Sequence, residues 1–124
     1  MKKRETIMKH VIHVDNSEFF RKLMKSFLSE KGLECESFEK GEDAISAVAN
    51  DRATFVITGL SLADMGGEEF LKRLMTLPQK TPIIVVTSSD ESIKHKRLEA
   101  LGVKSIILKS EDWKKELTKI LHLE

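Results

Sequence analysis

The amino-acid sequence predicts an α/β domain of element order (βα)5, in which helices cover both faces of a doubly wound five-stranded parallel sheet. Short apolar runs alternate with longer stretches of helical period along the whole chain. Residues 82–87, Pro-Ile-Ile-Val-Val-Thr, are typical of a strand that is buried on both faces, as strands of a parallel sheet are. No Pro-rich, Ser-rich or low-complexity stretch interrupts the alternation, so we expect one domain.

Five segments rich in Val, Ile and other apolar residues are predicted to be strands. The stretches between them are long enough for the crossover helices that parallel strands require. His10 and His13 lie three positions apart on the first strand, so we expect their side chains on opposite faces and no metal-binding pair. The predicted strands are residues 10–14, 33–38, 54–58, 82–87 and 104–108.

A helix is predicted after each strand. In the first, residues 17–31, apolar side chains recur at spacings of three and four, with Ser17 or Asn16 as the expected N-cap and Gly32 at the end. The last helix, residues 111–121, has Ser110 as its expected N-cap. The others are residues 42–50, residues 68–75, which Pro78 stops, and residues 91–101, which Gly102 closes.

The composition is that of an ordinary globular protein. Of the 124 residues, 40% are apolar and 33% are charged, and 21 basic residues balance 20 acidic ones, so we expect no binding to a nucleic-acid backbone. The single cysteine, Cys35, cannot form an internal disulfide, and no run of about 18 apolar residues predicts a membrane span. We therefore expect a cytoplasmic protein without a membrane anchor, with residues 1–8 as a flexible basic leader and residues 9–124 as the domain.

Polar residues follow four of the predicted strands. In a doubly wound sheet the carboxyl ends of the strands form the crevice where ligands bind and chemistry takes place. The residues directly after the strands are therefore the candidates for function. They are Asp15, Asn16, Gly59, Ser61, Thr87 and Lys109.

Several motifs in order resemble the receiver domain of response regulators, in particular the chemotaxis-regulator type. The resemblance runs from Lys9 to about Leu121, and it implies a flavodoxin-like three-layer fold and a role in two-component phosphorelay signalling. The matching segments are Val-Ile-His-Val-Asp-Asn-Ser-Glu-Phe-Phe-Arg-Lys-Leu-Met at 11–24, Gly-Glu-Asp-Ala at 41–44, Phe-Val-Ile-Thr at 55–58, Thr-Pro-Ile-Ile-Val-Val-Thr-Ser at 81–88 and Leu-Gly-Val-Lys-Ser-Ile-Ile-Leu-Lys at 101–109.

The resemblance implies an aspartate at the end of the third strand that accepts a phosphoryl group beside a magnesium ion. That position is Gly59, which has no side chain to attack phosphorus. The magnesium ligands of the family fall on Asn16, Gly59 and the carbonyl of Ser61, so only the neighbouring Asp15 still offers a carboxylate. We therefore expect a degenerate pseudo-receiver with no cofactor and with weak or absent magnesium binding.

Other parts of the family's apparatus persist. Thr87 matches the hydroxyl and Lys109 the lysine that engage the phosphoryl group. One interpretation is that Lys109 pairs with Asp15 and Thr87 makes a local hydrogen bond; the other is that both bind an anion delivered by a ligand. The aromatic residue that switches with the threonine in the family falls on Ile106, so that switch is expected to be missing.

A basic run on the fourth helix is the candidate partner surface, together with a tryptophan on the fifth. In the family, the face made by the fourth helix, fifth strand and fifth helix binds partners or a second copy. The alternative is that the charges are simply solvated and the tryptophan belongs to the core. The residues are Lys94, His95, Lys96, Arg97 and Trp113.

Three functions follow from these patterns. The first is a non-enzymatic module that binds a protein without phosphorylation, its partner being a sensor kinase, an output domain or a second copy. The second is a phospho-acceptor that uses a substitute acid, Asp64 or Asp15. The third is a sensor that binds a nucleotide or another anion in the crevice, although no Gly-rich phosphate loop is present.

Overall fold

The computed structural model describes residues 9–50, 53–89 and 92–122 and confirms the predicted order of strands and helices. The expected leader, residues 1–8, lies outside the described residues. In chain order the elements are β1 (His10–Val14), α1 (Glu18–Glu30), β2 (Glu34–Phe38), α2 (Gly41–Asn50), β3 (Phe55–Thr58), α3 (Gly67–Met75), β4 (Ile83–Thr87), α4 (Ser92–Ala100), β5 (Ser105–Leu108) and α5 (Trp113–Ile120).

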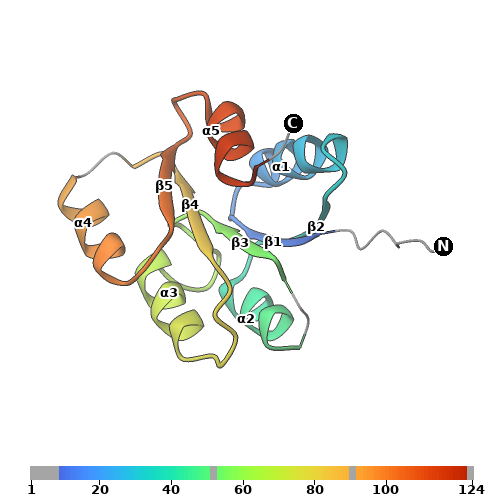
Figure 1. The fold of residues 1–124 in the computed structure, drawn as a ribbon. Helices are drawn as coiled ribbons and strands as arrows, with labels where there is room; N and C mark the ends of the chain where they lie inside the picture. Colours follow the sequence, from blue (N-terminus) through green and yellow to red (C-terminus); the bar gives the residue numbers. More distant parts are fainter. Residues whose placement is uncertain (1–8, 51–52, 90–91, 123–124) are drawn as a thin grey trace.

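The strands form one parallel sheet in the order β2-β1-β3-β4-β5. Helices α1 and α5 cover one face, α2 and α3 cover the other, and α4 lies beside the edge strand β5 (Figure 1). The chain moves outward from β1 to β2 and then returns past β1 to β3, so the direction of winding reverses between β1 and β3. Ligand crevices lie at such a reversal, at the carboxyl ends of the strands.

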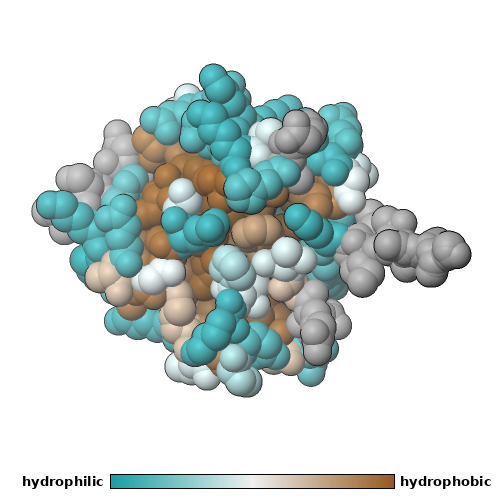
Figure 2. Space-filling view, in the orientation of Figure 1, coloured by the Kyte–Doolittle hydropathy of each residue, from teal (hydrophilic) through white to brown (hydrophobic). Residues whose placement is uncertain are grey.

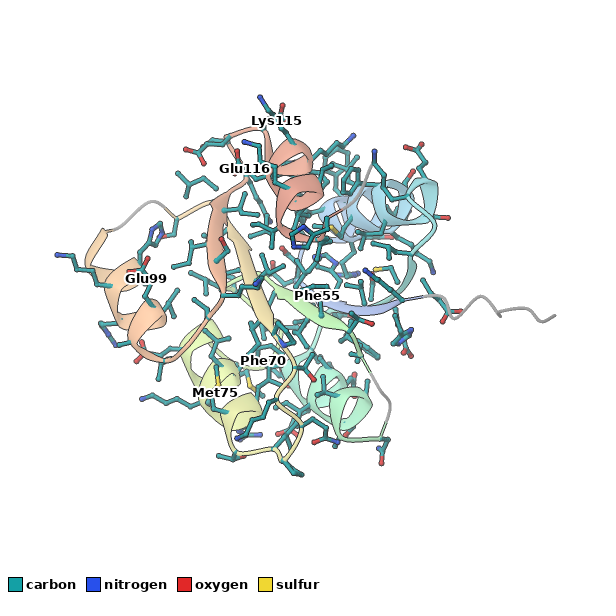
Figure 3. The ribbon with its side chains drawn as sticks, in the orientation of Figure 1. Phe55, Phe70, Met75, Glu99, Lys115 and Glu116 are labelled. Atoms are coloured by element: carbon teal, nitrogen blue, oxygen red, sulfur yellow. The ribbon has the colours of Figure 1, made fainter. Side chains whose placement is uncertain are left out.

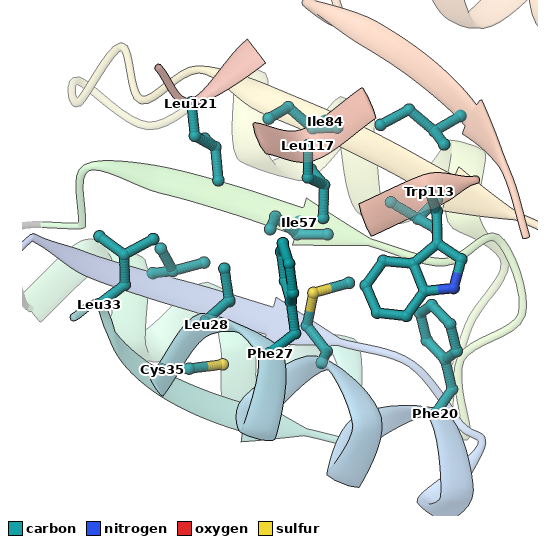
Figure 4. Close-up of a cluster of buried hydrophobic side chains, with 14 residues drawn as sticks. Phe20, Phe27, Leu28, Leu33, Cys35, Ile57, Ile84, Trp113, Leu117 and Leu121 are labelled. Atoms are coloured by element: carbon teal, nitrogen blue, oxygen red, sulfur yellow. The ribbon is translucent and has the colours of Figure 1, made fainter. Parts of the chain in front are cut away.

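Each face of the sheet carries its own hydrophobic core, because alternate residues of a strand point to opposite faces. On β1, Val11 packs towards α1 and α5, whereas Ile12 and Val14 pack towards α2 and α3. Figure 4 shows the first core, in which Phe27 of α1 meets the side chains of α5. In the second core Phe70 of α3 is fully buried (Figure 3).

The ends of two helices test the predicted caps. Ser17 is the N-cap of α1, since its side-chain oxygen accepts a hydrogen bond from the N–H of Phe20 at 3.1 Å. Gly32 follows the helix with a positive φ of 78°, a conformation that glycine adopts without strain. The prediction of Ser110 as the cap of α5 is wrong. The helix begins only at Trp113, so the capping position falls on Asp112, which accepts from the N–H of Lys115 at 3.2 Å.

The helices are too short and too polar for a membrane span. Of the helices that the structure describes, none combines the length and the apolar character needed to cross a bilayer. Every one of them is instead short and packed on the sheet or beside it (Figure 1).

Candidate functional site

The crevice predicted from the strand ends is present at the carboxyl edge of the sheet. It is an open cavity of about 320 Å³ between the ends of β1, β3, β4 and the segment that follows β5. All six of the residues predicted from the strand ends line it, which confirms that the fold brings them together. The full lining is Asp15, Asn16, Ser17, Gly59, Leu60, Ser61, Val86, Thr87, Ser88 and Lys109.

Asp15 is the one carboxylate in this lining, and it is only 2% exposed. One of its oxygens, Oδ1, accepts a hydrogen bond from the N–H of Ser17 at 2.9 Å, and the other, Oδ2, lies 2.9 Å from Nζ of Lys109. Its backbone carbonyl accepts a hydrogen bond from Arg21 at 2.8 Å. The interpretation that Lys109 pairs with Asp15 is therefore confirmed.

Lys109 is held by an aromatic ring as well as by the carboxylate. Its Nζ lies 4.2 Å from the centroid of the Phe20 ring, within the range of a cation–π contact. Phe20 in turn packs against Trp113 with 5.0 Å between ring centroids. The positive charge that could attract an anion is thus already offset by Asp15 and directed over a ring.

Thr87 makes the local hydrogen bond that one of the two interpretations required. Its hydroxyl oxygen accepts from the N–H of Ser89 at 3.0 Å, and the side chain is buried. Gly59 is buried at the end of β3, where its N–H donates to the carbonyl of Val14 at 2.9 Å. Position 59 therefore presents no side chain to the crevice.

The crevice residues fit a magnesium ion poorly. Asp15 is already paired with Lys109, and Asn16 offers a neutral amide in place of a charged oxygen. The carbonyl of Ser61 accepts a hydrogen bond from the N–H of Asn16 at 3.3 Å. Among the described residues, no group of three or more His, Cys, Asp or Glu side chains could hold a metal ion.

Asp64, one of the two substitute acids considered, serves a different element. Its carboxylate accepts hydrogen bonds from the N–H groups of Gly41 at 2.7 Å and Glu42 at 3.1 Å, at the start of α2. Desolvation alone would raise the pKa of Asp64, but these two bonds, together with a bond to its own N–H and the charge of Lys40, outweigh desolvation and hold the pKa below its ordinary value. Asp64 does not line the crevice, so the structure does not unite it with Thr87 and Lys109.

His13 lies close to the crevice, and the sequence predicts no functional role for it. It lies two residues before Asp15 and is fully buried, with its ring centroid 5.9 Å from that of Phe20. Burial lowers its pKa from 6.5 to about 4; Asp15 opposes this shift, whereas Lys109 and Arg21 add to it. Neither ring nitrogen has a hydrogen-bond partner among the described residues. A histidine inside an apolar strand was the available signal.

The predicted partner surface remains a prediction, and its residues differ in exposure and in their contacts. On α4, Lys96 is exposed, but Arg97 pairs with Glu68 of α3 at 2.6 Å and His95 bonds to the carbonyl of Ser89 at 2.8 Å. Lys94, also on α4, is partly exposed.

Trp113 and Ile106 have the positions of packed side chains. Assigning Trp113 to the partner surface was wrong, because α5 turns it inward against Phe20 and Phe27 and leaves it only 9% exposed (Figure 4). Its alternative assignment to the core is correct. Ile106 lies half-buried on β5 against the core beneath α2 and α3 and does not line the crevice.

The strand order, the four crossover helices with α5 after the last strand, and the crevice at the β1 and β3 ends define a receiver-type α/β fold. The family model described as "Response regulator receiver domain" matches residues 11–122, and the chain belongs to this family. Among solved structures, the chemotaxis response regulator CheY4 of Vibrio cholerae has a TM-score of 0.84 at 26% identity, over 94% of this chain and 98% of that one. The signal receiver domain of a LuxO repressor protein from Vibrio parahaemolyticus has a TM-score of 0.85 at 22% identity, over 94% and 88%.

Curated relatives are longer proteins of two-component signalling and regulation. The Regulator of RpoS of Escherichia coli K12 is 23% identical over 101 residues, which are 82% of this chain and 30% of the relative. The sensor histidine kinase RcsC of the same strain is 23% identical over 99 residues, which are 80% of this chain and 10% of the relative. This chain therefore spans less than a third of the length of these relatives.

Proposed function

We propose that this chain is a receiver-type signalling module that binds a partner protein without being phosphorylated, and that it is not an enzyme. One observation carries the proposal: among the described residues that line the crevice, Asp15 alone has a carboxylate, which is tied to Lys109 and to the N–H of Ser17, and position 59 has none. A carboxylate that is buried and paired is a poor nucleophile for phosphorus. The crevice therefore lacks both an acceptor and a place for the metal.

The same ion pair disfavours the anion-sensor alternative. Within the described part of the chain, Lys109 is the one cation that lines the crevice, and its charge is offset by Asp15 at 2.9 Å. The remaining polar groups are hydroxyls and an amide, which recognise no particular charge. We therefore place the function on a surface of the domain.

The two edges of the sheet differ in a way that supports a partner surface at β5. At the other edge, β2 exposes Glu34 and Glu36, and His10 contacts both carboxylates, at 3.2 and 3.5 Å. Such charges keep an edge strand from pairing with another chain. At β5, by contrast, Ile106 and Leu108 are partly exposed, and Figure 2 shows hydrophobic surface gathered over this strand between α4 and α5.

A partner-capture experiment tests the proposal. The intact protein is used to capture partners from the source cell, with and without acetyl phosphate and magnesium. One variant combines Lys96→Glu and Ile106→Ala on the proposed surface. Its matched control combines Lys40→Glu and Ile45→Ala, which are similarly exposed and half-buried positions around the start of α2.

The proposal predicts capture of the same protein with and without the phosphoryl donor, at least tenfold weaker with the surface variant and unchanged with the control. A second copy of this chain is one of the possible partners, and sedimentation of the purified protein would identify it. Capture that required acetyl phosphate would contradict phosphorylation independence. If the surface variant and the control variant captured equally less of the partner, the partner would not bind at the proposed surface.

A further inference from the structure

Gly59 does more than lack a carboxylate, because its missing side chain makes room for Asp15. A Cβ atom at position 59 would lie 2.7 Å from Oδ2 and 3.1 Å from Cγ of Asp15. The next atom it would meet, Oδ1 of the same carboxylate, is 3.6 Å away. The Asp15 carboxylate therefore lies where any side chain at position 59 would have to begin.

In this position the carboxylate connects four parts of the fold. It extends from the end of β1, lies over the end of β3, accepts from the N–H of Ser17 before α1, and meets Lys109 after β5. Lys109 then contacts the Phe20 ring of α1, which packs on Trp113 of α5. The segment between β5 and α5 is thereby fastened to the centre of the sheet.

We infer that Gly59, Asp15 and Lys109 form a permanent internal lock, in which Gly59 is the positioning residue that seats the carboxylate. The lock takes the place of the exchangeable phosphoryl group and metal of a working receiver, and it holds the segment between β5 and α5 in one arrangement. Its effect on partner binding rests on the proposed function. The lock itself does not, because its stability and the exposure of Lys109 are measured without a partner.

Gly59→Ala tests the lock, with Gly66→Ala as the matched control. A Cβ at position 66 would have no atom within 4 Å, and neither glycine has a positive φ. In Gly59→Ala the added methyl displaces the carboxylate from Lys109. We expect its melting temperature to fall by about 5–10 °C, less than the loss of one partner of a buried ion pair would cause in a domain of this size, because the displaced carboxylate keeps its charge and can turn to another position; that of Gly66→Ala should change by less than about 2 °C.

A double-mutant cycle assigns the effect to Asp15. In the Asp15→Ala background the atoms that a Cβ at position 59 would meet are gone, so adding Gly59→Ala should cause no further loss. If Gly59→Ala alone does not fold, the double variant should recover the fold. Additive losses, or a double variant that also fails to fold, would overturn the inference.

The reactivity of Lys109 supplies a second readout. Its side chain is 25% exposed while it is paired, and Lys104 serves as an exposed reference lysine in the same molecule. Acylation by an amine-reactive ester, mapped by peptide mass spectrometry, should rise several-fold at Lys109 in Gly59→Ala and stay constant at Lys104. No change at Lys109 would also overturn the lock. If these tests of the lock gave the expected results but the capture experiment found no partner, only the proposed function would be contradicted.

Discussion

A buried carboxylate needs a cation or hydrogen-bond donors, and the Asp15 carboxylate has one of each. The N–H of Ser17 and the ammonium group of Lys109 each lie 2.9 Å from one of its oxygens. Removing either partner would leave a buried charge without compensation, which is costly in a medium of low dielectric constant. The persistence of Lys109 therefore has a structural cause that is independent of phosphoryl transfer.

Restoring the acids of a working receiver should change this balance. Gly59→Asp combined with Asn16→Asp places three carboxylates at one crevice and forces Asp15 away from its present seat. Like charges a few ångströms apart cost on the order of several kcal/mol at an effective dielectric constant near 20, unless a cation neutralises them. We expect a lower melting temperature without magnesium and recovery of much of the loss at millimolar magnesium.

Thermal unfolding with and without magnesium checks this expectation, with the parent protein as the control. The parent should show no shift, because a ligand stabilises only in proportion to its binding. A repaired protein that responded to magnesium no more than the parent would show that these residues do not form a metal site even when recharged.

The buried His13 predicts a dependence of stability on pH. Its pKa is about 4 in the folded protein and 6.5 when the chain is unfolded, so the unfolded state binds the proton more readily. Above about pH 6.5, His13 therefore causes no loss in the free energy of unfolding. As the pH falls from there towards 4, the free energy of unfolding decreases, because protonation favours the unfolded state. At pH 5 the expected loss is about 2 kcal/mol.

His13→Val removes the titrating ring and keeps a strand-forming side chain. Urea unfolding at pH 7.5 and pH 5 should show that the variant loses about 2 kcal/mol less than the parent over this interval. All other groups titrate in both proteins and cancel in the comparison. Equal losses would mean that His13 is protonated in the folded protein without cost.

Single residues at the crevice were predictable from their place at strand ends, whereas their neighbours in space were not. The pairing of Asp15 with Lys109 followed from two strands whose carboxyl ends share one edge. The contact of Lys109 with Phe20 and the seat at Gly59 depend on side-chain directions and on distances across elements, which sequence spacing does not contain. The capping role of Asp64 was missed for the same reason.

At the scale of elements, the apolar runs predicted all the strands to within one residue at each end, because buried parallel strands read as continuous hydrophobic segments. The start of α5 was predicted two residues too early. The stretch from Ser110 to Asp112 offers two residues that cap helices well, Ser110 and Asp112, and the inward packing of Trp113 selects between them. Tertiary packing decided what local propensity left open.

The cap of α5 yields a prediction with an internal control. Asp112→Ala removes the oxygen that accepts from the N–H of Lys115 and should lower the free energy of unfolding by about 1 kcal/mol. Ser110→Ala, at the exposed position first predicted as the cap, should change it by less than about 0.5 kcal/mol. Urea unfolding of both variants is the measurement. The reverse order of effects would restore Ser110 as the cap.

At the scale of the whole molecule, a complete receiver fold surrounds a crevice in which the charge of Asp15 is balanced by that of Lys109. The cores on both faces of the sheet are intact, and the family model matches from residue 11 to residue 122. The hydrophobic pattern preserved the fold, since folding depends on burial. Phosphoryl transfer depends on a few charged atoms, and positions 16 and 59 carry an asparagine and a glycine. The function that we propose therefore keeps the receiver fold without its phosphoryl chemistry.

Intact-mass spectrometry after incubation with acetyl phosphate and magnesium tests the central claim most directly. The account predicts an unchanged mass, because position 59 has no carboxylate and Asp15 is paired with Lys109. Incubation with beryllofluoride, followed by amide NMR, should likewise leave the spectrum of the crevice residues unchanged. An acid-labile mass increase of one phosphoryl group would contradict the account, and fragment spectra would show whether Asp15 or Asp64 had accepted it.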